Sequence, residues 1–77
     1  MPTIVVIENL KIQIFADAHN PPHFHAVTPD REALIRLSDL SILAGSLSGR
    51  ELNAAVQWAE SHQKELADEW QRLNPGR

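Results

Sequence analysis

The chain has 77 residues, of which 43% are apolar, and a formal net charge of −3 with its histidines neutral. This length suffices for one small hydrophobic core but not for two, so we expect a single domain over residues 1–77. The lack of cysteine excludes disulfides, thiolate metal sites and thiol nucleophiles, and the acidic balance argues against a broad basic surface for nucleic acid.

The start of the chain, Met1–Ile7, has neither the basic residues nor the long apolar run of a secretory signal. No segment of the sequence approaches the length needed to span a bilayer. We therefore expect a cytoplasmic protein that does not interact with a membrane.

Apolar and β-branched residues alternate through most of the first half of the chain, which is typical of strands. Four or five strands are expected within residues 3–47, at Thr3–Ile7, Leu10–Ala18, Phe24–Val27, Ala33–Leu37 and Ser41–Leu47. The turn signals between them are short enough to join antiparallel neighbours. The pattern predicts a small antiparallel meander.

The periodicity changes at Ser48, because Ser48-Gly49-Arg50-Glu51 has the pattern of a capping box at the start of a helix. From there to Leu73 an apolar stripe recurs at helical spacing, and Asn74-Pro75-Gly76 supplies a stop. The stripe consists of Leu52, Ala55, Val56, Ala59, Gln63, Leu66, Trp70 and Leu73. We expect one long helix over about residues 49–73, packed on the sheet to give an α+β fold.

Three of the four histidines lie in the stretch His19–His25, which reads HNPPHFH. If the flanking strands pair as a hairpin around Pro21-Pro22, alternation places one set of side chains towards the helix and another away from it. The set facing the helix is Ile12, Ile14, Ala16, Phe24 and Ala26. On the other face His19 lies opposite His23 and Asp17 opposite His25, which predicts a polar patch of these four residues.

One interpretation of this patch is a metal site. Neutral imidazoles of His19, His23 and His25 would bind zinc or another divalent ion, with Asp17 as the fourth ligand or as a group that orients a ligand. A site with three histidine ligands leaves a position for a water to be activated, as in a small metal-dependent hydrolase.

A second interpretation is general acid–base catalysis. One histidine would remove a proton from a nucleophile and another would donate one to a leaving group, while an arginine stabilises the developing anion. The candidates for that arginine are Arg31, Arg36 and Arg50, of which Arg36 alone is tied to a predicted strand. Catalysis is therefore assigned to His19, His23, His25 and Arg36, and a ribonuclease needs only such groups.

A third interpretation is purely structural. The histidines and the Pro-Pro step would fix a turn, with the imidazoles bonded to backbone groups or half-buried against Phe15 or a partner chain.

Three segments together resemble a known family: Met1–Ile4, the stretch His19–His25, and Val56–Glu60 followed by His62, Glu65 and Leu66. They resemble the small bacterial family called domain of unknown function 4160. Its members resemble candidate toxins of type II toxin–antitoxin modules, encoded beside a second small protein that would serve as antitoxin. The resemblance implies a protein partner. It also implies that the functional site lies at His19, Asn20, His23 and His25, but it implies no particular reaction.

We therefore expect a toxin-like component of a bacterial type II module that acts on RNA or on translation through the histidine patch. The alternatives are a non-catalytic interaction module of a two-protein operon and a small metal-binding hydrolase. The expected partners are a cognate small protein, RNA as a local substrate, and a second copy of the chain in a homo-oligomer.

Overall fold

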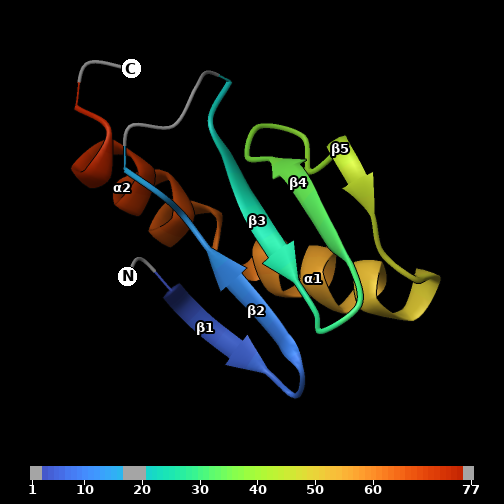
Figure 1. Ribbon diagram of the computed structural model, residues 1–77. Coiled ribbons are helices and arrows are strands. Elements are labelled where there is room, and N and C mark those ends of the chain that lie inside the picture. The colour runs from blue at the N-terminus through green and yellow to red at the C-terminus, as the bar shows by residue number, and fades with distance from the viewer. Residues whose placement is uncertain (1–2, 17–20, 76–77) are drawn as a thin grey trace.

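The computed structural model describes residues 3–16 and 21–75, and within these ranges the chain forms five strands followed by two helices (Figure 1). The elements are β1 (Thr3–Ile7), β2 (Leu10–Gln13), β3 (His23–Val27), β4 (Glu32–Arg36), β5 (Ile42–Ser46), α1 (Gly49–Ser61) and α2 (Gln63–Leu73). The strands form one antiparallel sheet in the order β1-β2-β3-β4-β5. The expected α+β class and meander are confirmed.

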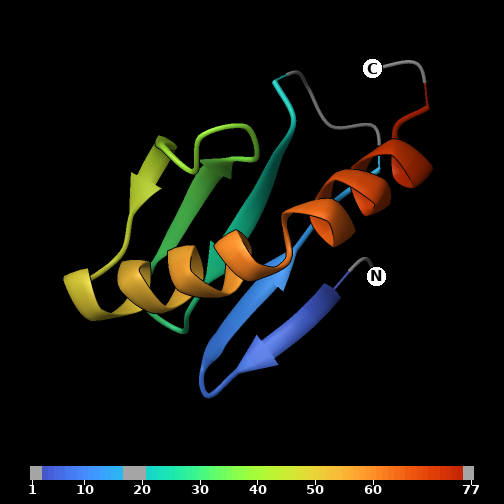
Figure 2. The same cartoon turned by 180° about the vertical axis from the view of Figure 1, so that it is seen from behind.

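The helices cover one face of the sheet, and the core lies between the two layers (Figure 2). The buried apolar residues of the described chain are Leu10, Ile12, Ile14, Phe24, Ala26, Ala33, Ile35, Ala55, Ala59, Leu66 and Trp70. The alternation in the sequence correctly predicts the helix-facing set with one exception, because Ala16 is exposed. None of the helices in the described parts of the chain is long and apolar enough to cross a membrane.

The prediction of one long helix is wrong, since the helical stretch breaks at His62. The Nδ1–H of His62 donates to the carbonyl oxygen of Trp58 at 2.7 Å, and the backbone N–H of His62 donates to Ala59 instead. The rings of Trp58 and His62 stack with their centroids 4.2 Å apart. Because the imidazole takes the acceptor that a continuous helix would use, α1 ends here and α2 begins one residue later. The predicted capping box is confirmed, with Ser48 and Glu51 bonded reciprocally.

The second strand is shorter than the predicted Leu10–Ala18, and its register differs from the predicted one. In β2 and β3 the residue opposite His25 is Gln13, four positions before the predicted Asp17. The connection between these strands therefore spans residues 14–22 rather than a tight turn. Pro21 and Pro22 have no N–H to donate, which disfavours a ladder that would run up to the prolines.

Candidate histidine site

The start of β3 places two imidazoles side by side. His23 and His25 are separated by one residue on the strand, so both side chains leave the same face, and their ring centroids are 5.3 Å apart. The other two members of the predicted patch, Asp17 and His19, lie outside the described residues.

His25 is held by β4 and by the segment that follows β2. Its Nδ1–H donates to Oε2 of Glu32, the first residue of β4, at 2.7 Å. The ring of Phe15 meets that of His25 edge to face, with centroids 4.7 Å apart. The His25 side chain keeps 19% of its surface exposed, so solvent or a ligand reaches part of the ring.

His23 is held more deeply. It is 8% exposed, its Nδ1–H donates to the carbonyl oxygen of Pro21 at 2.9 Å, and its ring centroid lies 5.3 Å from that of Trp70 in α2. The prediction that the histidines turn away from the core is therefore wrong for His23. On the β2 side the pairing stops at Gln13 and His25, and the ring of Trp70 in α2 lies against that of His23.

Both imidazoles use the same ring nitrogen for anchoring. A carbonyl oxygen and a carboxylate only accept hydrogen bonds, so each Nδ1 carries the proton and the neutral ring has its lone pair on Nε2. The hydrogen bond to Pro21 is the backbone contact that the structural interpretation predicts, whereas the Glu32 carboxylate on His25 is the arrangement that orients a histidine for proton transfer.

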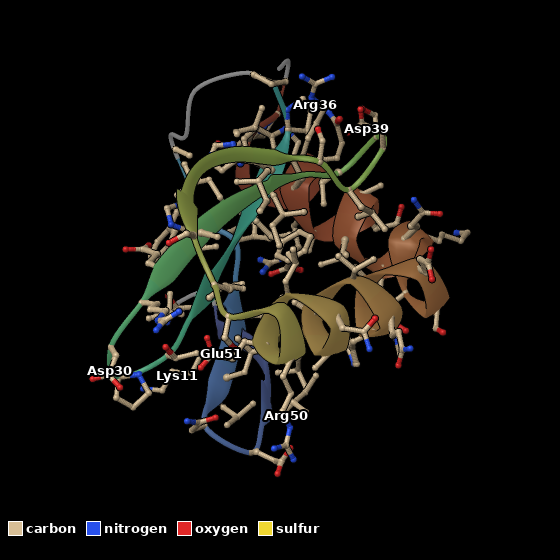
Figure 3. All side chains as sticks on the ribbon, turned by 90° about the vertical axis from the view of Figure 1, so that its right-hand side faces the viewer. Lys11, Asp30, Arg36, Asp39, Arg50 and Glu51 are labelled. Carbon is tan, nitrogen blue, oxygen red and sulfur yellow. The ribbon has the colours of Figure 1, made fainter. Side chains whose placement is uncertain are left out.

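Arg36 is the arginine that the fold brings to this site. It is the residue directly opposite His23 in the β3–β4 ladder, and it lies with Asp39 at one end of the molecule, opposite the end that carries Arg50 (Figure 3). Its Nη1–H donates to Asp39 at 3.5 Å. Hydrogen bonds from the hydroxyl and the N–H of Ser41 hold the pKa of Asp39 below its ordinary value, and the charge of Arg36 adds to this effect.

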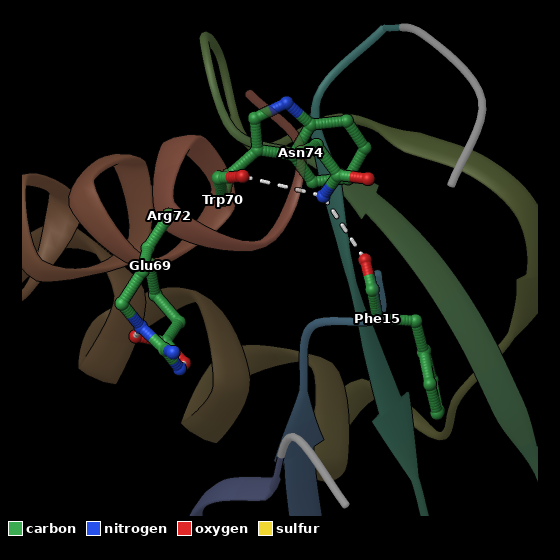
Figure 4. A network of polar contacts seen from close by, with 5 residues as sticks. All are labelled: Phe15, Glu69, Trp70, Arg72 and Asn74. Carbon is green, nitrogen blue, oxygen red and sulfur yellow. Dashed lines mark hydrogen bonds and ion pairs between the residues drawn. The ribbon is translucent and has the colours of Figure 1, made fainter. Parts of the chain in front are cut away.

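A network of polar contacts attaches α2 to the segment that follows β2 (Figure 4). The buried amide of Asn74 donates from Nδ2 to the carbonyl oxygens of Phe15 at 3.0 Å and of Trp70 at 3.2 Å. Two of the residues that this network fixes, Phe15 and Trp70, are those whose rings meet His25 and His23. The network thus helps to position both imidazoles.

The described residues contain no group of three or more histidine, aspartate and glutamate side chains arranged to hold a metal ion. Of the predicted ligand set, they include His23 and His25, and Nδ1 of each is already engaged with an oxygen. The zinc or other divalent site with His19 and Asp17 remains a prediction.

Two residues of this site, Glu32 and Trp70, were not predicted from the sequence. Glu32 follows the turn after β3, and a tight β3–β4 hairpin would have placed it on the histidine face near His25. Trp70 was assigned to the core on its helical spacing, which is correct at 2% exposure, but spacing does not reveal that its ring contacts His23.

The fold and the site define a class: a small α+β domain with an oriented histidine pair and an arginine at one end of its sheet. The family model described as Domain of unknown function (DUF4160) matches residues 9–71, and the chain belongs to this family. The match includes the histidine stretch and most of both helices. Comparison with curated proteins and with solved structures finds no match.

Proposed function

We propose that this chain is the toxin-like component of a bacterial, cytoplasmic two-protein module, and that it cleaves RNA through His23, His25 and Arg36. The observation that carries the proposal is the pair of imidazoles, 5.3 Å apart, each anchored through Nδ1 so that Nε2 is the working nitrogen. The module and its antitoxin-like partner are suggested by the family resemblance alone.

The proposed chemistry needs two imidazoles in opposite protonation states. Neutral His25, oriented by Glu32, takes the proton of a ribose 2′-hydroxyl through Nε2, and the 2′-oxygen attacks the adjacent phosphorus. Protonated His23 gives its Nε2 proton to the departing 5′-oxygen as the P–O5′ bond breaks. The products are a 2′,3′-cyclic phosphate and a free 5′-hydroxyl, and the guanidinium of Arg36 stabilises the extra negative charge on the phosphate during the attack.

Asparagine at the two positions gives a direct test. Its amide reproduces the Nδ1–H donor of histidine but has no counterpart of Nε2, so the His23→Asn/His25→Asn variant keeps the anchoring geometry and loses the proton-transfer atoms. Induction of the wild-type chain in a sensitive bacterium should arrest growth and should release RNA fragments with cyclic phosphate ends, whereas the double variant should do neither.

The matched control is His62→Asn, because His62 also donates from Nδ1 to a carbonyl oxygen but lies at the α1–α2 break. This variant should arrest growth as the wild type does. Equal growth with the wild type and with the double variant, at equal amounts of folded protein, would refute the proposal.

The open edges of the sheet favour a second candidate, a non-catalytic module that recruits a strand of a cognate protein. Within the described chain, β1 and β5 each have a strand neighbour on one side only, and each carries an exposed large apolar side chain, Val6 at 55% and Ile42 at 42%. Neither strand contains the charged residues that usually protect an edge.

Copurification with the product of a neighbouring small gene tests this candidate. A complex that survives His23→Asn/His25→Asn but is lost in Val6→Lys or Ile42→Lys would support strand recruitment. A complex that tolerates both lysine variants, or a chain that always purifies alone, would contradict it.

A further inference from the structure

Two hydrogen-bond donors in the described part of the chain are buried without an acceptor, and both belong to residues that flank His23. They are Nε–H of Arg36 and Nε1–H of Trp70. Buried donors without an acceptor are rare, because burial costs them their bonds to water. Their occurrence on two sides of one histidine suggests that a ligand supplies the acceptors.

The two donors come from different layers of the fold. Arg36 reaches the site from β4, directly opposite His23, and Trp70 reaches it from α2, with its ring centroid 5.3 Å from that of His23. In Figure 4 the indole nitrogen of Trp70 lies on the side of the ring away from Phe15, so it points away from the amide network of Asn74. The network therefore leaves this donor unused.

We propose that Arg36, Trp70 and His23 form a binding site for a phosphate group. Both unpartnered atoms are N–H donors and one belongs to a permanent cation, a combination that selects an anion with several acceptor oxygens. The carboxylates that contact these residues leave both donors unused, because Glu32 accepts from His25 and Asp39 accepts from Ser41 and from Nη1 of Arg36, not from its Nε. A phosphate accepts hydrogen bonds from two separated donors more readily than a carboxylate does, because its oxygens are arranged tetrahedrally rather than in one plane.

The route of entry follows from exposure. The Arg36 side chain is 40% exposed and held by one long contact to Asp39, whereas Trp70 is only 2% exposed. A phosphate therefore pairs first with the outer nitrogens of Arg36, and the shift of that side chain then opens the path to the buried indole donor. This proposal goes beyond the proposed function, since phosphate binding requires no cleavage of RNA.

The test uses the indole signals in a proton–nitrogen NMR spectrum of the intact chain. Its two tryptophans give one indole N–H signal each, and Trp58→Phe identifies the signal of Trp70. Inorganic phosphate, titrated to saturate a site with a dissociation constant of about 1 mM, should shift the Trp70 signal and leave that of Trp58 in place. Chloride at matched ionic strength should shift neither.

Arg36→Gln should abolish the phosphate-induced shift, whereas Arg31→Gln, which removes the same charge from the exposed turn between β3 and β4, should retain it. Phosphate that shifts neither signal, shifts both alike, or acts unchanged on folded Arg36→Gln would overturn the proposal.

A second titration with short single-stranded RNA identifies the source of the phosphate. A shift with both ligands assigns the site to nucleic-acid phosphates, and a shift with inorganic phosphate alone assigns it to a free phosphate group. A shift without any RNA cleavage would leave the phosphate site standing and refute the proposed function.

Discussion

Gly45 in β5 shows how one residue permits the site on the neighbouring strand. Its φ of 77° lies in the left-handed region, and a Cβ added there would overlap the carbonyl oxygen of Glu32. Glu32 is the residue whose carboxylate holds His25. The close approach of the two strands beneath that carboxylate thus depends on glycine.

We predict that Gly45→Ala lowers the free energy of unfolding by at least about 2 kcal/mol, because backbone strain and the clash with Glu32 add together. Urea unfolding followed by circular dichroism measures the change. Gly49→Ala is the control, since a Cβ there meets nothing within 4 Å and alanine favours the first turn of α1. Equal stability of the two variants would contradict this account.

At the scale of elements, periodicity predicts which faces are buried better than it predicts where elements end. The strand expected over Leu10–Ala18 extends too far because Ile14 remains fully buried after the last β2–β3 pair at Gln13. Burial of the apolar face thus continues one residue beyond the ladder, because a pattern of apolar residues reports burial rather than pairing. The break at His62 escaped prediction because it depends on a hydrogen bond between a side chain and the backbone.

The candidate site was predictable to a similar extent. The sequence predicted His23 and His25 on one face of a strand and Arg36 on a different strand. The structure brings these three residues together. The register between β2 and β3 and the contacts of the histidines with Glu32 and Trp70 depend on how separate parts of the chain are placed relative to one another. Sequence spacing alone does not determine that placement.

The attachment of α2 gives a prediction at this scale. Asn74→Ala should lower the free energy of unfolding by about 1 to 3 kcal/mol, because the carbonyl oxygen of Phe15 loses the buried donor that links it to the helix. It should also broaden the NMR signals of His23 and His25, whose ring neighbours become less constrained. Asn53→Ala on the exposed face of α1 should be neutral or slightly stabilising. Identical unfolding curves for the two variants would refute the role of Asn74.

For the molecule as a whole, two carboxyl groups at the surface, those of Asp39 and Glu69, have lowered pKa values. Hydrogen bonds from Arg72 hold the pKa of Glu69 below its ordinary value of 4.5, as the bonds from Ser41 do for Asp39. A carboxyl group whose pKa is lower in the folded state stabilises the fold above its unfolded pKa. That contribution is lost as the pH falls through the folded-state value, so acid should destabilise the protein.

Glu69→Gln tests this pH dependence. At pH 7 the variant should be less stable than the wild type by about 0.2 to 1 kcal/mol, the usual range for an exposed ion pair. The difference should decrease as the pH falls below 4.5 and disappear below the folded-state pKa, where the wild-type carboxyl group is also protonated. Denaturant unfolding at a series of pH values measures it, with Glu60→Gln as a control for the loss of one carboxylate. A difference that persists in acid would contradict the explanation.

The β3–β4 hairpin carries most of the chemistry proposed for this protein within one contiguous stretch. His23, His25, Glu32 and Arg36 lie in it, and its turn is closed by paired bonds between Thr28 and Arg31. The relative placement of these four side chains therefore depends on contacts close in sequence, which form early in folding and at low entropic cost. The helix layer then adds the ring of Trp70 against His23, so in the described chain the long-range part of the site consists of a single contact with a hairpin whose other groups are already close in sequence.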